Sequence, residues 1–277
     1  MHSLPNSKTN SRLSPARLIL DLLDADPAAM SSAQRIVAAG SVFDFSQNQM
    51  RVALSRLTSE RLLRKIARGH YALSPEAEKL HKEIQRWHHL DQSIVPWTGD
   101  WGVVVCGNLA AESSALFRAQ QRALSMRGLR RWRPGLWLRP NNLKGGLQQL
   151  VSDLQALGLD AIQGSFVMSE TDAASYKELL SLWNTEQINS EYSARRQTLG
   201  SAILRLQDTV SPMRSNILME TMELGSDTIR FLLKDPLLPD GLTDSQARAN
   251  LVSCMEHYDR LGRELWQTFI NELESRP

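Results

Sequence analysis

The sequence predicts a mostly helical α+β protein built from three parts. Two observations predict this class. Apolar residues recur at helical spacing over long stretches at both ends of the chain, and short apolar runs alternate with helical segments between residues 101 and 168. With 277 residues, the chain is long enough for two or three domains with hydrophobic cores. The expected domains are residues 1–90, 91–171 and 172–277.

Several classes of protein are not expected from the composition. The chain has no run of about 18 apolar residues, and its polar start MHSLPNSKTNSRLSP lacks the apolar core of a secretory signal. We therefore expect a cytoplasmic protein without a membrane partner. The two cysteines, Cys106 and Cys254, are far apart and are not at metal-ligand spacing from each other or from histidines. Both are expected to be buried, inert thiols, and neither a metal nor a cofactor is expected.

The first elements are a polar arm and two short helices. Residues 1–14 are rich in Ser and Asn, and their Lys8 and Arg12 either contact phosphate or belong to a solvated tail. A helix over 15–23 opens with proline in its first turn and has apolar residues at helical spacing. A second helix over 31–40 is expected to end at Gly40, which suits a C-terminal cap.

The third helix has the clearest boundary signal and two different faces. Ser46 with Gln49 three residues later forms a capping box, so the helix is expected to begin there. One stripe carries Met50, Ala53, Leu54 and Leu57, and it continues to Arg61. The other stripe carries amide, hydroxyl and guanidinium groups, which are the types that read base edges in a major groove. Its members are Gln47, Asn48, Arg51, Ser55 and Thr58.

A cationic hairpin is expected directly after this helix. Two β-prone runs, 62–67 and 70–73, meet at the turn 68–69, where glycine permits a tight reversal. Three helices followed by a hairpin within about 75 residues is the layout of a winged helix-turn-helix. The predicted DNA contacts are Gln47, Asn48, Arg51, Ser55, Arg56, Arg64, Lys65, Arg68 and His70.

The charge distribution agrees with DNA binding at one end. Residues 1–90 carry 13 lysines and arginines against 8 acidic residues, an excess of five positive charges. The rest of the chain has an excess of three negative charges, although the whole chain has a net charge of +2. A localised positive excess is typical of a protein that holds DNA at one end only.

The middle and C-terminal parts follow from alternation and helical spacing. A helix over 74–90 and a linker near 96–99 come first. The middle part is predicted as β-α-β-β-α-β, a ferredoxin-like unit, with strands at 101–109, 136–138 and 161–168, a further strand around 129–133, and helices at 112–128 and 143–157. The C-terminal part is predicted as helices at 172–188, 190–210, 212–233 and 244–274, interrupted by KDPLLPDGL. Its aromatic residues are expected to be core: Trp183, Tyr192, Tyr258, Trp266 and Phe269.

A basic run without acids occupies residues 113–152. It contains eight cations, among them Arg130, Arg131 and Arg133. This run suits contacts to DNA beside the operator, the phosphates of an anionic ligand, or a solvated basic face, and the sequence leaves these three open.

Several strings resemble a known family over nearly the whole chain. They are PARLILDLL in the first helix, SQNQMRVALSRLTSERLLRK around the third helix, PGLWLRP at 134–140 and KDPLLPDGL at 234–242. Together they resemble the PaaX family of bacterial repressors of aromatic-acid catabolism. The resemblance implies a winged helix, a central domain similar to the Cas2 fold and a helical C-terminal domain.

The resemblance also implies a mode of action. Such repressors bind operator DNA as homodimers and are released by an aryl-CoA thioester, which is phenylacetyl-CoA for the best-known members. For this chain the effector is expected to be such a thioester or an aromatic acid. Arg130, Arg131 and Arg133 are the candidates for its phosphates.

Two other functions are alternatives to DNA binding. A nuclease built on the Cas2-like part needs an acidic residue at the end of its first strand, but that strand reads VVVCGNL and the first acid is Glu112. No other catalytic motif is present in the sequence, so no catalytic residue is expected. A winged helix that binds another protein is the second alternative, and salt dependence of DNA binding separates it from the DNA-binding repressor.

Overall fold

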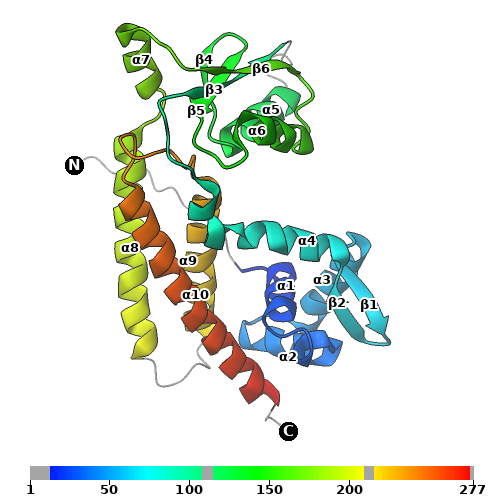
Figure 1. The fold of residues 1–277 in the computed structure, drawn as a ribbon. Helices are drawn as coiled ribbons and strands as arrows, with labels where there is room; N and C mark the ends of the chain where they lie inside the picture. The colour runs from blue at the N-terminus through cyan, green and yellow to red at the C-terminus, as the bar shows by residue number, and fades with distance from the viewer. Residues whose placement is uncertain (1–12, 108–114, 209–214, 275–277) are drawn as a thin grey trace, which may run out of the picture. The chain divides into compact units, whose positions relative to one another are not determined.

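The computed structural model describes residues 13–107, 115–208 and 215–274 (Figure 1). These residues form a mostly helical α+β structure with a small antiparallel sheet, which confirms the predicted class. The expected polar arm with Lys8 and Arg12, and the expected acid Glu112, lie outside the described residues.

The chain divides into two compact units, and each is assembled from separate stretches of sequence. Unit 1 comprises Met1–Gln85, Ser201–Asp227 and His257–Pro277, and unit 2 comprises Arg86–Gly200 and Thr228–Glu256. The division falls within each of three long helices, α8 (Thr185–Gln207), α9 (Ser215–Leu233) and α10 (Ser245–Glu274).

Unit 1 begins with two helices that carry one apolar face each. Helix α1 (Pro15–Ala25) starts at the cap Ser14, whose hydroxyl accepts from Arg17 N at 3.2 Å. After a short 3-10 turn, α2 spans Ala33–Val42. The expectation that α2 ends at Gly40 was wrong. Gly40 is buried inside the helix, and a Cβ atom there would lie 2.5 Å from Met50 Cγ. The missing side chain makes room for Met50 and does not cap the helix.

Helix α3 (Gln47–Ser59) begins where the capping box predicted. Ser46 Oγ accepts from Gln49 N at 3.2 Å, and Gln49 Oε1 accepts from Ser46 N at 2.8 Å. The predicted extension of its apolar stripe to Arg61 was wrong, because the helix ends at Ser59 and Arg61 adopts φ 59°. This left-handed residue turns the chain into the hairpin.

Ser46→Ala is expected to lower the free energy of unfolding by about 1 kcal/mol, because the Gln49 amide then loses its acceptor. Urea denaturation followed by far-UV circular dichroism measures the effect. Ser41→Ala is the control, since Ser41 is an exposed serine whose hydroxyl bonds only to the carbonyl of Ala38 in its own helix. Equal losses in the two variants would contradict a capping role.

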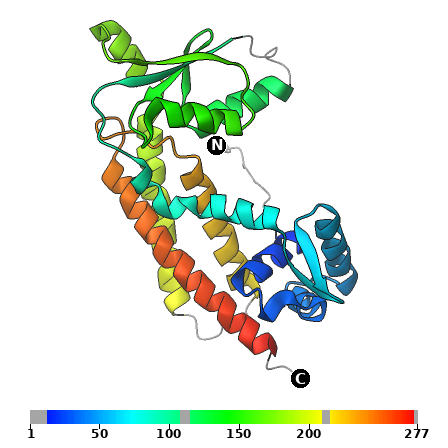
Figure 2. The ribbon, with the colours of Figure 1, turned by 45° about the vertical axis from the view of Figure 1, so that its right-hand side comes forward.

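A hairpin follows α3 directly. Strands β1 (Leu63–Ala67) and β2 (His70–Leu73) pair antiparallel, and Gly69 makes the turn with φ 73°. Helix α4 (Pro75–Ile84) then starts with Ser74 Oγ accepting from Ala77 N at 3.1 Å. Helices α1 to α3 and the hairpin lie side by side in both views (Figure 1 and Figure 2).

The core of unit 1 joins the start of the chain to segments near its end. Phe43 stacks on Trp266 with ring centroids 5.8 Å apart and meets Phe269 edge-on at 5.8 Å. Leu218 from α9 and Ile270 from α10 are buried in the same cluster. The helices α1 to α3 therefore bury their apolar faces partly against α9 and α10.

Unit 2 contains the small sheet, and its elements appear in the predicted order. They are β3 (Trp101–Cys106), α5 (Ala115–Met126), β4 (Arg130–Arg133), β5 (Leu136–Pro140), α6 (Gly146–Ala156) and β6 (Ile162–Met168). The strand order is β4-β5-β3-β6, and all neighbours are antiparallel. The expected strand around 129–133 is β4, which forms one edge of the sheet.

Both faces of this sheet are covered at its two central strands, β3 and β5. Val104 and Trp137 pack on one face against Leu124 of α5 and Leu154 of α6, which lie on that side in Figure 1. The alternate residues of the same strands belong to a second cluster on the other face. That cluster is made of Trp101, Val103, Leu138, Leu179, Trp183, Leu238 and Leu242.

The C-terminal helices differ from the prediction at one break. Helices α7 (Ala173–Leu180), α8 (Thr185–Gln207), α9 (Ser215–Leu233) and α10 (Ser245–Glu274) are observed. One helix was expected over 172–188, but it stops at Leu180, because Trp183 turns into the second sheet cluster and its indole N–H donates to Gly128 O at 3.2 Å. The five aromatic residues expected in the core are all buried.

Candidate nucleic-acid interface

The polar face of α3 is exposed as the sequence predicted. Met50, Ala53, Leu54 and Leu57 are buried in the core of unit 1, which fixes the rotation of the helix. The opposite face therefore points to solvent. The predicted contacts on it are all exposed: Gln47, Asn48, Arg51, Ser55 and Arg56.

Two pairs of side chains define the electrostatics of this face. Arg51 Nη2 donates to Gln47 Oε1 at 3.5 Å, so two predicted base readers lie next to each other one turn apart. Arg56 Nε lies 3.0 Å from Glu60 Oε1, and this ion pair offsets part of the Arg56 charge. An exposed pair of this kind contributes little to stability and can be exchanged for a phosphate contact. Arg51 is accordingly the stronger candidate for a base and Arg56 for the backbone.

The hairpin presents the predicted DNA contacts. Arg64, Lys65, Arg68 and His70 are all exposed. No acidic residue occurs between Glu60 and Glu76 in the sequence, so the whole hairpin has a positive charge. Such a surface attracts phosphate and releases counterions when it binds nucleic acid.

The tip of the hairpin is tied to the helices by a contact that the sequence did not reveal. Ala33 N donates to Gly69 O at 2.8 Å, and Ser32 forms an isolated bridge with His70. The start of α2 therefore holds the turn. This contact restrains the hairpin and therefore the positions of Arg64, Lys65 and Arg68 relative to α3. A two-stranded hairpin without such a contact is only marginally stable.

The three arginines of β4 have different environments. Arg131 and Arg133 are exposed, whereas Arg130 is half-buried and burial lowers its pKa. Arg133 forms a two-pronged ion pair with Glu178, in which Nη2 lies 2.7 Å from Oε2, and its guanidinium lies 4.8 Å from the centre of the Trp132 ring. Hydrogen bonds from Arg133 and Trp132 lower the pKa of Glu178 to about 2. An anionic ligand at Arg133 would compete with this carboxylate.

Arg139, a fourth arginine of the basic run, is fully enclosed. Its guanidinium donates to the carbonyls of Arg127 (2.6 Å), Pro140 (3.1 Å) and Leu237 (3.3 Å) and to Asn142 Oδ1 (2.9 Å). Burial lowers its pKa to about 9, which still leaves it charged at neutral pH. Arg139 therefore has a structural role and is not part of a basic surface.

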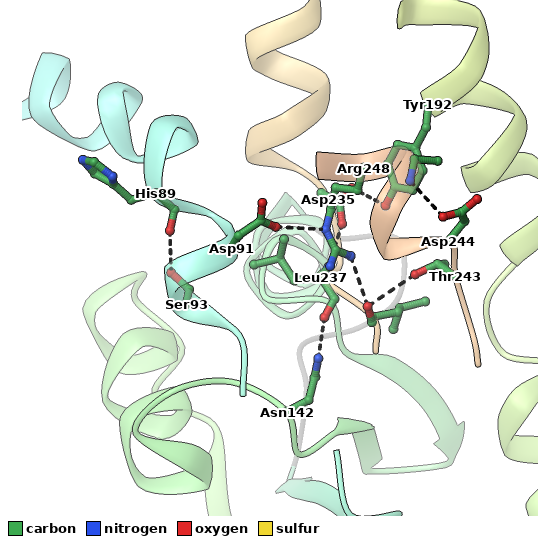
Figure 3. A network of polar contacts seen from close by, with 12 residues as sticks. His89, Asp91, Ser93, Asn142, Tyr192, Asp235, Leu237, Thr243, Asp244 and Arg248 are labelled. Atoms are coloured by element: carbon green, nitrogen blue, oxygen red, sulfur yellow. Dashed lines mark hydrogen bonds and ion pairs between the residues drawn. The ribbon is translucent and has the colours of Figure 1, made fainter. Parts of the chain in front are cut away.

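The segment between α9 and α10 is held by a buried polar network that sequence patterns did not predict (Figure 3). Tyr192 donates to Asp235 Oδ2 at 2.5 Å, and Leu237 N donates to Asp235 Oδ1 at 2.7 Å. Burial raises the pKa of Asp235, against the opposite effect of these bonds and of the Arg248 charge. Arg248 is also buried and donates to Leu238 O at 3.1 Å. The sequence shows only Asp235 directly before Pro236, and Arg248 further along in α10.

The described residues offer little for metal or thiol chemistry. Across 13–107, 115–208 and 215–274, no group of three His, Cys, Asp or Glu side chains is placed to hold a metal ion. Cys106 is buried, and burial raises the pKa of its thiol to about 11. Cys254, expected to be buried, is half-buried, and its pKa is also raised by burial. In the part of the chain described, no helix is both long and apolar enough to cross a membrane.

Comparisons with known proteins give a fold likeness only. No protein-family model and no curated protein matches the sequence. Among solved structures, the uncharacterized protein Rv0674 from Mycobacterium tuberculosis is similar, with a TM-score of 0.58 and 19% sequence identity. The likeness covers 92% of this chain and 99% of that one, so residues of both units take part in it.

Proposed function

We propose that this chain is a DNA-binding transcriptional regulator. The observation that carries the proposal is the exposed polar face of α3 beside a hairpin with three exposed cations, an exposed histidine and no acid. A helix of this composition suits the major groove, where Arg pairs with guanine and Asn or Gln with adenine. The hairpin cations suit the flanking phosphates.

The local architecture supports the same proposal. Helices α1 to α3 with β1 and β2 have the order of a winged helix-turn-helix, in which the third helix reads bases and the wing contacts the backbone. The order β3-α5-β4-β5-α6-β6, with strands arranged β4-β5-β3-β6, has the pattern of a ferredoxin-like unit. Both patterns agree with those implied by the resemblance to PaaX repressors.

The two most specific strings of that resemblance contact each other. Arg139 of PGLWLRP donates to the carbonyl of Leu237 in KDPLLPDGL, and Asn142 Nδ2 donates to the same oxygen at 2.8 Å. Each string therefore has a structural partner in the other. On this ground we propose a repressor of the PaaX type, acting as a homodimer and released by an aryl-CoA thioester or an aromatic acid.

A mobility-shift titration on the upstream intergenic DNA tests the proposal. If Arg56, Arg64, Lys65 and Arg68 all contact phosphate, raising the salt from about 0.05 to 0.2 M weakens binding roughly a hundredfold. Release by phenylacetyl-CoA would support the family effector. Binding that ignores the thioester would point to another aryl compound. Absence of salt-sensitive binding would favour the alternative, a winged helix that binds protein.

Arg51→Ala is expected to weaken binding by about 1–3 kcal/mol and to relax the preference for one base pair, because a base contact is lost. Arg68→Ala should instead weaken all sequences alike, since a phosphate contact carries no sequence information. Competition titrations with operator and scrambled duplexes separate the two effects. Arg263→Ala, an exposed arginine of α10 paired with Asp259, is the control and should bind as the wild type. If Arg51→Ala lowered the affinity for both duplexes equally, Arg51 would not be a base reader.

A further inference from the structure

One exposed side chain on the polar face of α3 does not match its neighbours. Val52 is 58% exposed, and it does not belong to the core cluster of unit 1. The other exposed residues of α3 are all polar: Gln47, Asn48, Gln49, Arg51, Ser55, Arg56 and Ser59. Val52 is thus an apolar group placed within the surface that we propose faces DNA.

Its position on the helix puts it among the predicted contacts. Asn48 precedes Val52 by four residues, and Ser55 and Arg56 follow it by three and four. Residues at these spacings are neighbours on a helix surface. Val52 therefore lies between an amide that can pair with adenine and a hydroxyl that can pair with any base.

Folding gives no reason for valine at this place. A β-branched side chain is a poorer helix former than alanine, because it loses rotamer freedom against the preceding turn. Because Val52 is exposed, burial of its methyl groups contributes little to the stability of the protein. Isolated apolar residues on a surface are common, but this one combines an unfavourable local preference with a central place on a polar face.

We propose that Val52 is a specificity-determining residue that contacts the C5-methyl group of a thymine in the DNA. The inference rests on the proposed DNA-binding function. The thymine methyl is the apolar group that the major groove displays, and apolar side chains recognise it by contact. Asn48 beside Val52 suits the adenine of the same or an adjoining A·T pair. The two side chains together favour a site rich in A·T pairs under this part of α3.

The test uses the full-length protein and duplexes chosen by in vitro selection from a random library. Each thymine of the selected duplex is replaced singly by deoxyuridine, which removes the methyl group and leaves base pairing and phosphates intact. At one thymine the wild-type protein is expected to lose about three- to fivefold in affinity, the effect of one buried methyl group. Val52→Ala should show a similar loss on the thymine duplex and no further loss with deoxyuridine.

The control is Val167→Ala, which truncates a valine of β6 that is 45% exposed. This variant should keep the full wild-type sensitivity to deoxyuridine. Circular dichroism verifies that Val52→Ala folds, as expected for a substitution that favours the helix.

The possible failures are distinguishable. Salt-sensitive binding in which no deoxyuridine substitution separates the wild type from Val52→Ala overturns this inference and leaves the proposed function intact. If both proteins lose the same affinity at each deoxyuridine, a group other than Val52 contacts the thymine methyl. This result also overturns the inference and leaves the proposed function intact. No salt-sensitive binding to any selected duplex overturns the proposed function and this inference with it.

Discussion

Arg139→Leu is expected to lower the free energy of unfolding by about 2–4 kcal/mol. The substitution removes the Arg139 donors of three backbone carbonyls and of Asn142 Oδ1. Leu237 O keeps its bond from Asn142 Nδ2. Each buried acceptor that loses its partner costs about 1–3 kcal/mol. Removing a charge from a buried site offsets part of this loss, since burial already lowers the pKa of the guanidinium.

Tryptophan fluorescence during urea denaturation reports the unfolding of the unit that contains Arg139. Six of the seven tryptophans lie in unit 2, which also contains Arg139. Arg122→Leu is the matched control, because Arg122 is an exposed arginine of α5, and it should change stability by no more than about 0.5 kcal/mol. Arg139→Lys should remain clearly destabilised, since an ammonium cannot reproduce the planar fork of donors. An unchanged denaturation midpoint in Arg139→Leu would contradict the structural role.

Neutralising the three hairpin cations is expected to weaken DNA binding about a hundredfold near 0.15 M salt. In the variant Arg64→Gln, Lys65→Gln, Arg68→Gln, three phosphate contacts and their released counterions are lost together. The slope of log affinity against log salt should fall by about 2.7, or 0.9 for each contact. Titrations at several salt concentrations give both quantities, and glutamine keeps the polar character of the exposed strands.

A second triple variant separates this local effect from that of net charge. Arg205, Arg260 and Arg263 are exposed arginines on α8 and α10, and their replacement by glutamine changes the net charge by the same amount. In this control, the slope of log affinity against log salt should differ from the wild-type slope by less than about 0.9, the value for one contact. If both triple variants lost affinity equally, general attraction would explain the binding and the hairpin would have no special part in it.

Much of α3 and the hairpin was predictable because their signals are local. Ser46 and Gln49 lie within one turn of each other, and Gly69 sits in the turn that it makes. The buried and exposed faces of α3 also follow from spacing along a single helix. These residues therefore appeared in the structure as expected, and the predicted contacts on α3 and the hairpin are exposed.

The features that the sequence did not predict depend on distant residues. Gly40 was taken for a cap because its role depends on Met50 of another helix. The basic run did not reveal which of its arginines is buried, because one of the carbonyls that bind Arg139 belongs to Leu237, far from the run. The break before α8 was missed for the same reason, since Trp183 leaves the helical path to reach a sheet that local spacing does not display. Val52 was not among the predicted DNA contacts, because the prediction considered only polar side chains on this face of α3.

The stacking of Phe43 on Trp266 and Phe269 has a consequence for biosynthesis. At the ribosome, residues of α2 emerge long before those of α10, by on the order of ten seconds or more at typical elongation rates. During this interval the nascent N-terminal helices exist without the aromatic partners that complete their core. Translation that stops before Trp266 would release a chain without the aromatic partners of Phe43, and such a product is an expected substrate for chaperones and proteases.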